Sequence, residues 1–508
     1  MPIPILTPEK MRSVERSYLE QYPCMSEAVL MERVAHEMAS YLEQWIRKQS
    51  QQGPILFVLG KGNNGADAAA TASLLKERGY ETVVCPLFSH GSPLLETHLQ
   101  RYKELGGVVC KDVLENTLWR PNFLACVDGL LGTGSNNALR GSRESQEPQK
   151  TQDLVASWIE KINQNSFKGV FAVDLPSGLD GSGNNPSPRV VRATHTFAIG
   201  AMKLGYFLQD GWNAVGEIVP ISLGLPPSLL DTTITCLEEK DLRIPSPERN
   251  QHKYQAGEVI LLCGSMPEAS SLAAHGAFRA GAGYVRVLSE GKRPPSLPIE
   301  AVCVEGTPRE TWKTCWKTCW KTWTSRISNR GCVLFGSGWE HDSKVIPLLL
   351  DDLLNDLSTQ SLALPLVVDG GAIGPYRYPP GTVLTPHWGE AQRLVPRQQQ
   401  CQRECRQGLE ACIEYAVNHG VHIVLKGATT WIISDQGKVQ VSSFGMASMA
   451  TAGMGDVLAG MVAAAKAKGD PIAPYVALHS RLASKASQQH GYGLMASDII
   501  KDVLAGKL

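Results

Sequence analysis

Residues 451–460 read Thr451-Ala452-Gly453-Met454-Gly455-Asp456-Val457-Leu458-Ala459-Gly460. Two glycines bracket one residue, an aspartate follows, and the small apolar run 457–465 predicts a helix. Glycine lets backbone amides approach a ligand, and the first helical turn leaves N–H donors unpaired at the positive end of the helix dipole. The stretch therefore predicts an anion site, with Asp456 beside it to take a proton from a hydroxyl. The alternative is a glycine-softened helix start that Asp456 caps.

The composition indicates a soluble globular protein with more than one domain. A length of 508 residues predicts two or three domains, and 49 basic against 49 acidic residues give no reason to expect a nucleic acid or an anionic membrane as partner. No apolar run reaches the length of a membrane span. The 13 cysteines are scattered and residues 1–10 lack a secretory pattern, so we expect reduced thiols and a cytoplasmic location.

In the first half, three strand-like runs end in polar turns that contain glycine. The run 55–59 leads into Gly60-Lys61-Gly62-Asn63-Asn64-Gly65-Ala66-Asp67 and then into an alanine-rich stretch, 68–78, that predicts a helix. The runs 124–128 and 170–174 each end in an aspartate before a turn. Alternating strands and helices predict a parallel sheet, whose ligands lie beyond the carboxyl ends of its strands. One such aspartate is commonly a turn cap, but three such strand ends favour a site.

The motifs GNNGAD (62–67), VDGLLGTG (127–134) and AVDLPSGLD (172–180) together resemble the epimerase domain of the bifunctional NAD(P)H-hydrate repair enzymes. The resemblance implies a Rossmann-like three-layer domain that interconverts the R and S forms of hydrated NADH or NADPH. It implies Asp174 as the acid/base residue, and Asn64, Asp128 and Ser177 as ligands of K+, an oxygen-rich set that suits a hard cation. The residues implied to bind the hydrate are Asn63, Asn64, Gly65, Ala66, Asp67, Gly132, Thr133, Gly134, Ser135, Asn136, Asn137, Ala138 and Asp174.

One position in the first half departs from this family's pattern. Ala66 stands where the family usually has glycine. If the position requires a positive φ, alanine strains the loop, because L side chains rarely adopt that conformation.

The second half repeats the alternation of strands and turns. Strand-like runs at 259–263, 332–335, 366–369 and 421–425 are followed by turns, among them LTPHWGE (384–390) and KGAT (426–429). With AGMGDVLAG (452–460) at the end, this order resembles the ADP/ATP-dependent NAD(P)H-hydrate dehydratase domain, which has a ribokinase-like three-layer fold.

The resemblance implies that the nucleotide, with Mg2+, phosphorylates the hydroxyl of the hydrated nicotinamide ring. Phosphate then leaves far more readily than hydroxide, and elimination restores NADH or NADPH. Asp456 takes the hydroxyl proton, the amides near Gly453 and Gly455 hold the moving charge, and Glu390 orients Mg2+ through water. The implied hydrate contacts are Ala269, Gly338, His387 and Asp456. The implied nucleotide contacts are Lys426, Gly427, Ala428, Thr429, Thr430 and Gly455.

Two segments of the second half differ from the family. The loop 264–270 carries Glu268-Ala269 where the family usually has Gly-Ala. The stretch from Trp312 repeats WKTC, WKTC and WKTW, and a period of four fits one side of a strand or a drifting stripe of a helix. A surface insertion without a binding function is the favoured interpretation of this repeat.

We therefore predict an α/β protein with an epimerase domain, residues 1–235, and a dehydratase domain, residues 236–508. Prolines at 226, 227, 245 and 247 place the boundary near residue 235. We expect NADH or NADPH hydrates and ADP or ATP as ligands, Mg2+ and K+ as cofactors, and a homo-oligomer. Two alternatives remain open, a ribokinase-like kinase of a vitamin precursor and a nucleotide-binding regulator with one decayed domain.

Overall fold

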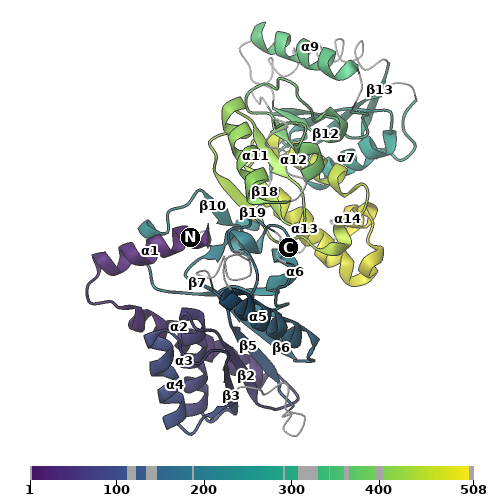
Figure 1. Cartoon of the computed structure of the whole chain (residues 1–508). Coiled ribbons are helices and arrows are strands. Elements are labelled where there is room, and N and C mark those ends of the chain that lie inside the picture. The colour runs from purple at the N-terminus through teal and green to yellow at the C-terminus, as the bar shows by residue number, and fades with distance from the viewer. Residues whose placement is uncertain are drawn as a thin grey trace. The chain divides into compact units, whose positions relative to one another are not determined.

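The computed structural model divides the chain into two compact units, Ile3–Thr232 and the chain from Thr233 onward. In Figure 1 the colour runs from purple at the start of the first unit to yellow at the end of the second. Among the described residues, no helix has both the length and the apolar content needed to cross a membrane. The structure describes residues 3–110, 122–132, 146–185, 188–246, 248–289, 292–306, 330–341, 344–359, 365–395 and 404–502.

The first unit is built on a parallel sheet with the strand order β4-β3-β2-β5-β6-β7-β9. Counted along the chain this order is 3-2-1-4-5-6-7, which extends the order of the Rossmann fold. The order reverses between β2 and β5, and ligands bind at such a reversal. The strands are β2 (Ile55–Leu59), β3 (Thr82–Pro86), β4 (Val108–Val109), β5 (Ala125–Gly129), β6 (Gly169–Val173), β7 (His195–Ile199) and β9 (Glu217–Ile221).

Helices cover both faces of this sheet because its strands are apolar on both sides. Alternate residues of β2 enter two cores: Phe57 packs with α2, α3 and α4, whereas Leu56 packs with α5. A short parallel pair, β1 with β8, lies outside this sheet. The remaining elements of this unit are α1 (Pro8–Gln21), α2 (Glu27–Arg47), α3 (Asn63–Glu77), α4 (Pro93–Glu104), α5 (Gln146–Gln164), α6 (Gly211–Val215), β1 (Ile3–Leu6), β8 (Met202–Lys203), η2 (Leu204–Tyr206) and η3 (Pro227–Leu229).

The second unit has its own sheet, in the order β13-β12-β11-β14-β15-β16-β17-β18-β19-β10. The strands from β13 to β17 are parallel, β18 is antiparallel to both of its neighbours, and the strand order reverses between β11 and β14. The strands are β10 (Ile234–Cys236), β11 (Glu258–Leu262), β12 (Tyr284–Ser289), β13 (Val302–Glu305), β14 (Gly331–Phe335), β15 (Leu366–Val368), β16 (Val383–Leu384), β17 (His422–Leu425), β18 (Thr430–Ile433) and β19 (Val439–Ser442).

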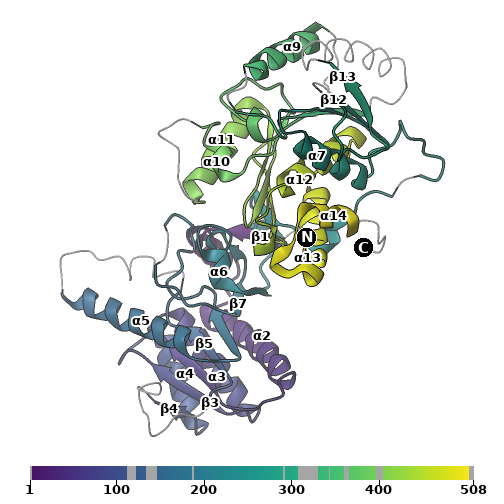
Figure 2. The same cartoon turned by 90° about the vertical axis from the view of Figure 1, so that its right-hand side faces the viewer.

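Helices again lie on both sides of the sheet. Figure 2 shows α7, α12, α13 and α14 on one side and α10 and α11 on the other. The first group shares one apolar core with the strands. The helices are α7 (Pro267–Arg279), α9 (Val345–Thr359), α10 (Trp388–Ala391), α11 (Arg406–His419), α12 (Met454–Lys468), α13 (Ala473–His490) and α14 (Ala496–Asp502), with 3-10 turns η4 (Glu239–Leu242), η5 (Gly370–Ala372), η7 (Ala447–Met449) and η8 (Gly491–Gly493).

These observations confirm the predicted α/β class with helices on both faces of parallel sheets. Two open points from the sequence are settled. Ala66 lies inside α3 and is absent from the positive-φ residues, so it strains nothing. Asp456 does not cap α12, because the N-cap is Gly453, at φ +90°, and the helix start has no side-chain cap hydrogen bond. The WKTC repeat lies outside the described residues.

Helices α7 and α12 touch backbone to backbone. A Cβ added at Gly460 of α12 would lie 1.9 Å from the carbonyl oxygen of Ala273, and one at Gly276 of α7 would lie 2.3 Å from that of Val457. Glycine at both positions lets the helix axes approach closely. This contact fixes the start of α12, and with it Asp456, relative to the sheet.

We expect Gly460→Ala to destabilise the second unit by at least about 1–3 kcal/mol, the usual cost of overpacking. The clash outweighs the gain of about 1 kcal/mol that alanine brings to a helix. Calorimetry should show a lowered melting transition. The control is Gly493→Ala, where an added Cβ meets nothing within 4 Å. Equal melting of the two variants would show that the helices tolerate a side chain at this contact.

Candidate functional site

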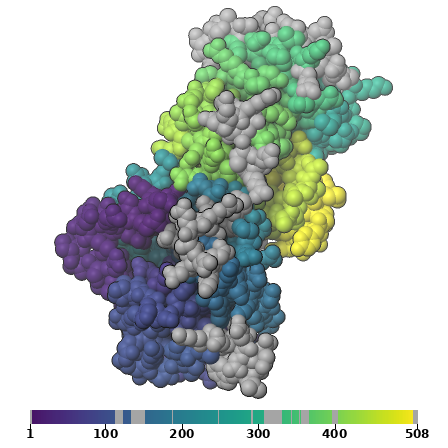
Figure 3. Space-filling view, viewed as in Figure 1, coloured from purple at the N-terminus to yellow at the C-terminus, as the bar shows by residue number. Residues whose placement is uncertain are grey.

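A cavity of about 930 Å³ lies at the carboxyl end of the first unit's sheet. Its lining comes from α1, α2, α5, the end of β7 and the segments after β2, β3, β5, β6 and β9, so it includes the reversal of strand order between β2 and β5. Figure 3 shows the purple atoms of the N-terminal helices above the blue atoms of the segment that follows. The predicted hydrate-binding residues that line the cavity are Asn63, Asn64, Asp67, Gly132 and Asp174.

The GNNGAD motif forms the first turn of α3. Its N-cap, Gly62, provides no side-chain hydrogen bond, so the amides at this end are open to a ligand. Gly65 and Ala66 are buried and do not line the cavity. A Cβ at Gly65 would lie 2.3 Å from the carbonyl oxygen of Gly60, so glycine here lets the turn after β2 close. The predicted contacts Thr133 to Ala138 lie outside the described residues.

Asp174 sits directly after β6 in the left-handed conformation, at φ +63°. This conformation is uncommon for a residue other than glycine and is often found at functional sites. Its carboxylate accepts hydrogen bonds from the amide of Ile199, at 3.2 Å, and from the ammonium of Lys203. Tyr206 donates to its backbone carbonyl. The surroundings therefore fix both the backbone and the side chain of Asp174.

Lys203 is the cation that pairs with Asp174, and our sequence analysis missed it. Its side chain is 1% exposed, and its Nζ also donates to the carbonyl of Ile199 at 2.8 Å. A buried ammonium requires a compensating anion, and Asp174 provides one. The sequence offered little signal, because Lys203 belongs to the two-residue strand β8 rather than to an obvious motif.

Two further carboxyl groups belong to this cavity. Burial, followed by the charge of Asp174, raises the pKa of Glu15 to about 7. Burial, then the charges of Asp174 and Glu15, raises the pKa of Asp67 well above its ordinary range. Glu15 is a second residue that we missed, because it lies on a polar amphipathic helix before the first motif.

Asn64, Asp128 and Ser177 come together beside the cavity. Asp128 is fully buried, and its two oxygens accept from the hydroxyl of Ser177 at 2.6 Å and from its amide at 2.8 Å. Burial raises the pKa of Asp128 to about 6, although these bonds lower it. The amide nitrogen of Asn64 donates to the carbonyl of Val173 at 2.5 Å. Carboxylate, hydroxyl and carbonyl oxygens thus gather within one small network.

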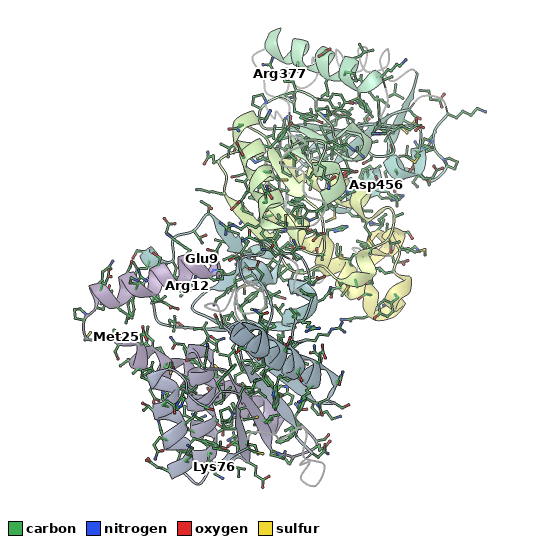
Figure 4. The ribbon with its side chains drawn as sticks, viewed as in Figure 1. Glu9, Arg12, Met25, Lys76, Arg377 and Asp456 are labelled. Carbon is green, nitrogen blue, oxygen red and sulfur yellow. The ribbon has the colours of Figure 1, made fainter. Side chains whose placement is uncertain are left out.

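In the second unit, Asp456 occupies the first turn of α12 (Figure 4). Burial, followed by the charge of Asp369, raises its pKa to about 7, against opposing effects of Lys426 and of a hydrogen bond from Ser337. A carboxylate of this kind is poised to accept a proton near neutral pH.

A buried ion pair lies next to Asp456. The Nζ of Lys426, at the end of β17, is 2.8 Å from Oδ1 of Asp369, which directly follows β15. Thr385 and Ser337 donate to the same carboxylate, at 2.6 and 3.1 Å. Burial lowers the pKa of Lys426, but Asp369 and other nearby carboxylates outweigh it and the net shift is upward. Our sequence analysis missed Asp369, although its place at a strand end resembles those of Asp128 and Asp174.

The other predicted dehydratase residues fall around this ion pair. His387 caps α10, where its Nδ1 accepts from the amide of Glu390 at 3.2 Å and its amide donates to Oε2 of Glu390 at 2.9 Å. The charge of Glu390 acts on both Lys426 and Asp456. Gly338 has φ +75°, and a Cβ there would lie 3.1 Å from that of Ala269, so these two predicted residues are neighbours.

The predicted nucleotide loop connects β17 to β18. Gly427, Ala428 and Thr429 form the turn, and Thr430 begins β18. Thr429 is 1% exposed, and its hydroxyl has no hydrogen-bond partner among the described residues. A Cβ at Gly455 would lie 3.0 Å from Nζ of Lys426, so this loop and the start of α12 face each other. An unpaired buried hydroxyl is available to a ligand.

Comparison with known proteins matches each unit to one family. Residues 27–205 match the family described as YjeF-related protein N-terminus. Residues 259–504 match the family described as NAD(P)H-hydrate dehydratase.

Curated relatives match both units together. Proteins described as bifunctional NAD(P)H-hydrate repair enzyme Nnr are 28% identical in Moorella thermoacetica, over 98% of this chain and 95% of the relative, and 28% identical in Thermofilum pendens, over 90% and 86%. A crystal structure of ADP/ATP-dependent NAD(P)H-hydrate dehydratase from Bacillus subtilis, co-crystallised with ATP and Mg2+, is 26% identical over 53% of this chain and 96% of its own, at a TM-score of 0.42. With both units matched in the same order as in these relatives, the chain belongs to the bifunctional NAD(P)H-hydrate repair enzymes.

Proposed function

We propose that the first unit interconverts the R and S hydrates at the cavity containing Asp174, and that the second dehydrates the S hydrate at the ion pair beside Asp456. The chain is an isomerase and a lyase of NAD(P)H-hydrate repair, and the dehydratase step uses ADP or ATP. The observation that carries the assignment of sites is the partly buried Asp456, with a pKa of about 7, next to Lys426 and Asp369.

In the second unit, each residue has a distinct role in phosphoryl transfer. Asp456 takes the proton from the hydroxyl of the hydrate, and the amides at the start of α12 stabilise the charge on the transferred phosphoryl group. Lys426 and the loop to Thr430 hold the nucleotide phosphates, with Gly455 bordering the AMP part. His387, Gly338 and Ala269 contact the hydrate.

The acidic groups of this site suit Mg2+. Asp369 and Glu390 lie near Lys426, and Mg2+ binds through one or two carboxylates while keeping much of its water. Bound there, the ion would neutralise charge on the phosphates. Asp369 also holds the ammonium of Lys426 in place through their ion pair.

In the first unit, Asp174 acts as the acid/base group, and Asn63, Asn64, Asp67 and the segment 132–138 bind the hydrate. Asn64, Asp128 and Ser177 supply oxygens of the kind that a hard cation prefers, and we assign K+ to them. The ion would add positive charge near the substrate phosphates. A homo-oligomeric, cytoplasmic enzyme remains our expectation from the sequence.

The direct test is incubation of the full chain with pure S hydrate of NADPH, with and without ADP or ATP, followed at the absorbance of NADPH. We expect regeneration only with nucleotide, together with release of free phosphate. A stable phosphorylated product instead would favour the vitamin-precursor kinase.

We expect Asp456→Asn to slow dehydration about a hundredfold to ten-thousandfold, the usual effect of removing a general base. The variant keeps the size of the side chain but cannot accept the proton. Nucleotide affinity should change little, because Lys426 and backbone amides hold the phosphates. R/S equilibration without nucleotide should match wild type. Asp174→Asn should give the reverse pattern, so each variant is the control for the other. Dehydration at the wild-type rate in Asp456→Asn would remove this residue from the mechanism.

We expect KCl to raise the melting temperature of the first unit above its value in tetramethylammonium chloride at equal ionic strength. A ligand that binds only the folded state stabilises it. Ser177→Ala should abolish the difference, because it removes one of the oxygens of the site. Identical melting of the wild-type protein in the two salts would refute the K+ assignment.

A further inference from the structure

Glu15 is a carboxyl group of the first cavity that lies outside both family matches. It belongs to α1, whereas the match to the first unit begins at residue 27. Glu15 and Asp174 nevertheless line the same cavity. Glu15 is only partly exposed, and glutamate is seldom withdrawn from water in this way.

The packing of α1 holds Glu15 in this place. The helix begins at an N-cap, Thr7, and buries Met11, Val14 and Tyr18 in the core. The methyl group of Met11 lies 2.4 Å from where a Cβ of Gly200 would be, so α1 packs directly on the turn after β7. Glu15 lies between these anchors, three residues after Arg12, which Figure 4 labels on this helix. The helix is therefore docked on the element that also carries Ile199, a partner of Asp174.

Asp174 and Glu15 have different charged groups around them. Asp174 forms an ion pair with the buried ammonium of Lys203 and also accepts a hydrogen bond from the amide of Ile199. Glu15 has a pKa of about 7 because of burial and the charge of Asp174; Glu27 acts in the same direction, and Lys203 and Arg12 oppose it. Asp67 faces both groups as well. Two carboxyl groups whose environments differ in this way are typical of an acid and a base in one site.

We propose that Glu15 is the second catalytic residue of epimerisation and acts as an acid on one face of the hydrate ring, with Asp174 as the base on the other. This inference rests on the proposed epimerase function.

The chemistry balances without an oxidant or reductant. Glu15 gives its proton to the hydroxyl of the hydrate, the carbon–oxygen bond breaks, and the lone pair of the neighbouring ring nitrogen forms a carbon–nitrogen double bond. Water leaves. A water molecule then adds to the same carbon from the opposite face: a lone pair of its oxygen forms the new carbon–oxygen bond, the electron pair of the double bond returns to the ring nitrogen, and Asp174 takes a proton from the water. The reverse direction exchanges the two roles.

The test uses the full chain with Glu15→Gln, which keeps size but cannot deliver the proton. We expect R/S equilibration at pH 7 to fall about a hundredfold to ten-thousandfold. Wild-type equilibration should fall in both directions as pH rises above about 7, the pKa of Glu15, because each direction needs the form of the site that holds one proton. The residual activity of the variant should lack this decline. Glu15→Asp keeps a proton donor and should recover part of the rate.

Two readouts separate catalysis from a structural role. The pKa of Glu15 is raised from 4.5 to about 7 on folding. The contribution of this group to the free energy of unfolding is therefore lost as pH rises from 4.5 to about 7, and the loss is complete above that pH. Glu15→Gln should therefore melt no lower than wild type at pH 8. Nucleotide-dependent dehydration of S hydrate by the same variant should be unchanged.

The matched control is Glu160→Gln on α5, which removes an exposed carboxylate whose Oε1 is 3.5 Å from Nε of Arg189. It should equilibrate the hydrates like wild type. If wild type equilibrates them and Glu15→Gln does so within twofold, Glu15 is not the acid. Lowered melting with little change in equilibration would likewise assign Glu15 to structure alone. If wild type does not equilibrate the hydrates, the proposed epimerase function itself is wrong.

Discussion

A buried ion pair between a lysine and an aspartate lies at the carboxyl end of the sheet in each unit. In the first unit it joins Lys203 to Asp174, and in the second it joins Lys426 to Asp369. An unpaired charge in these positions would cost several kcal/mol, and removing one partner of such a pair commonly costs about 3–5 kcal/mol. Each pair therefore constrains the turns that carry it, and the remaining site residues are arranged around it.

Each ammonium group is surrounded by more than one carboxyl group. Glu15 and Asp67 lie around the first pair, and Asp456 and Glu390 around the second. Burial and the charge of the paired aspartate raise the pKa of Glu15 and that of Asp456 to about 7, and burial raises the pKa of Asp67 well above its ordinary range. The arrangement does not maximise stability. It places more than one carboxyl group in each site, where such groups can transfer protons to and from a substrate.

The sequence predicted most of the architecture because buried parallel strands are short apolar runs. The run 55–59 coincides with β2. The sequence did not reveal site residues whose role depends on a contact between distant segments. Lys203 gains its role only because the chain returns to the turn after β6, and Glu15 only because α1 docks on the turn after β7. The start of α3 was predicted too late, since the helix begins at Asn63, five residues before the predicted start at 68, and Ala66 within it needs no unusual backbone.

The contact between α7 and α12 has a mechanical consequence. Ala269 lies in the first turn of α7 and Asp456 in the first turn of α12, and Gly276 and Gly460 bring the two backbones together further along. No side chain separates the helices at these points, so neither can slide or rotate without displacing the other. A substrate that moves the start of α7 therefore also moves the carboxylate on α12, and these two parts of the second site respond as one rigid body.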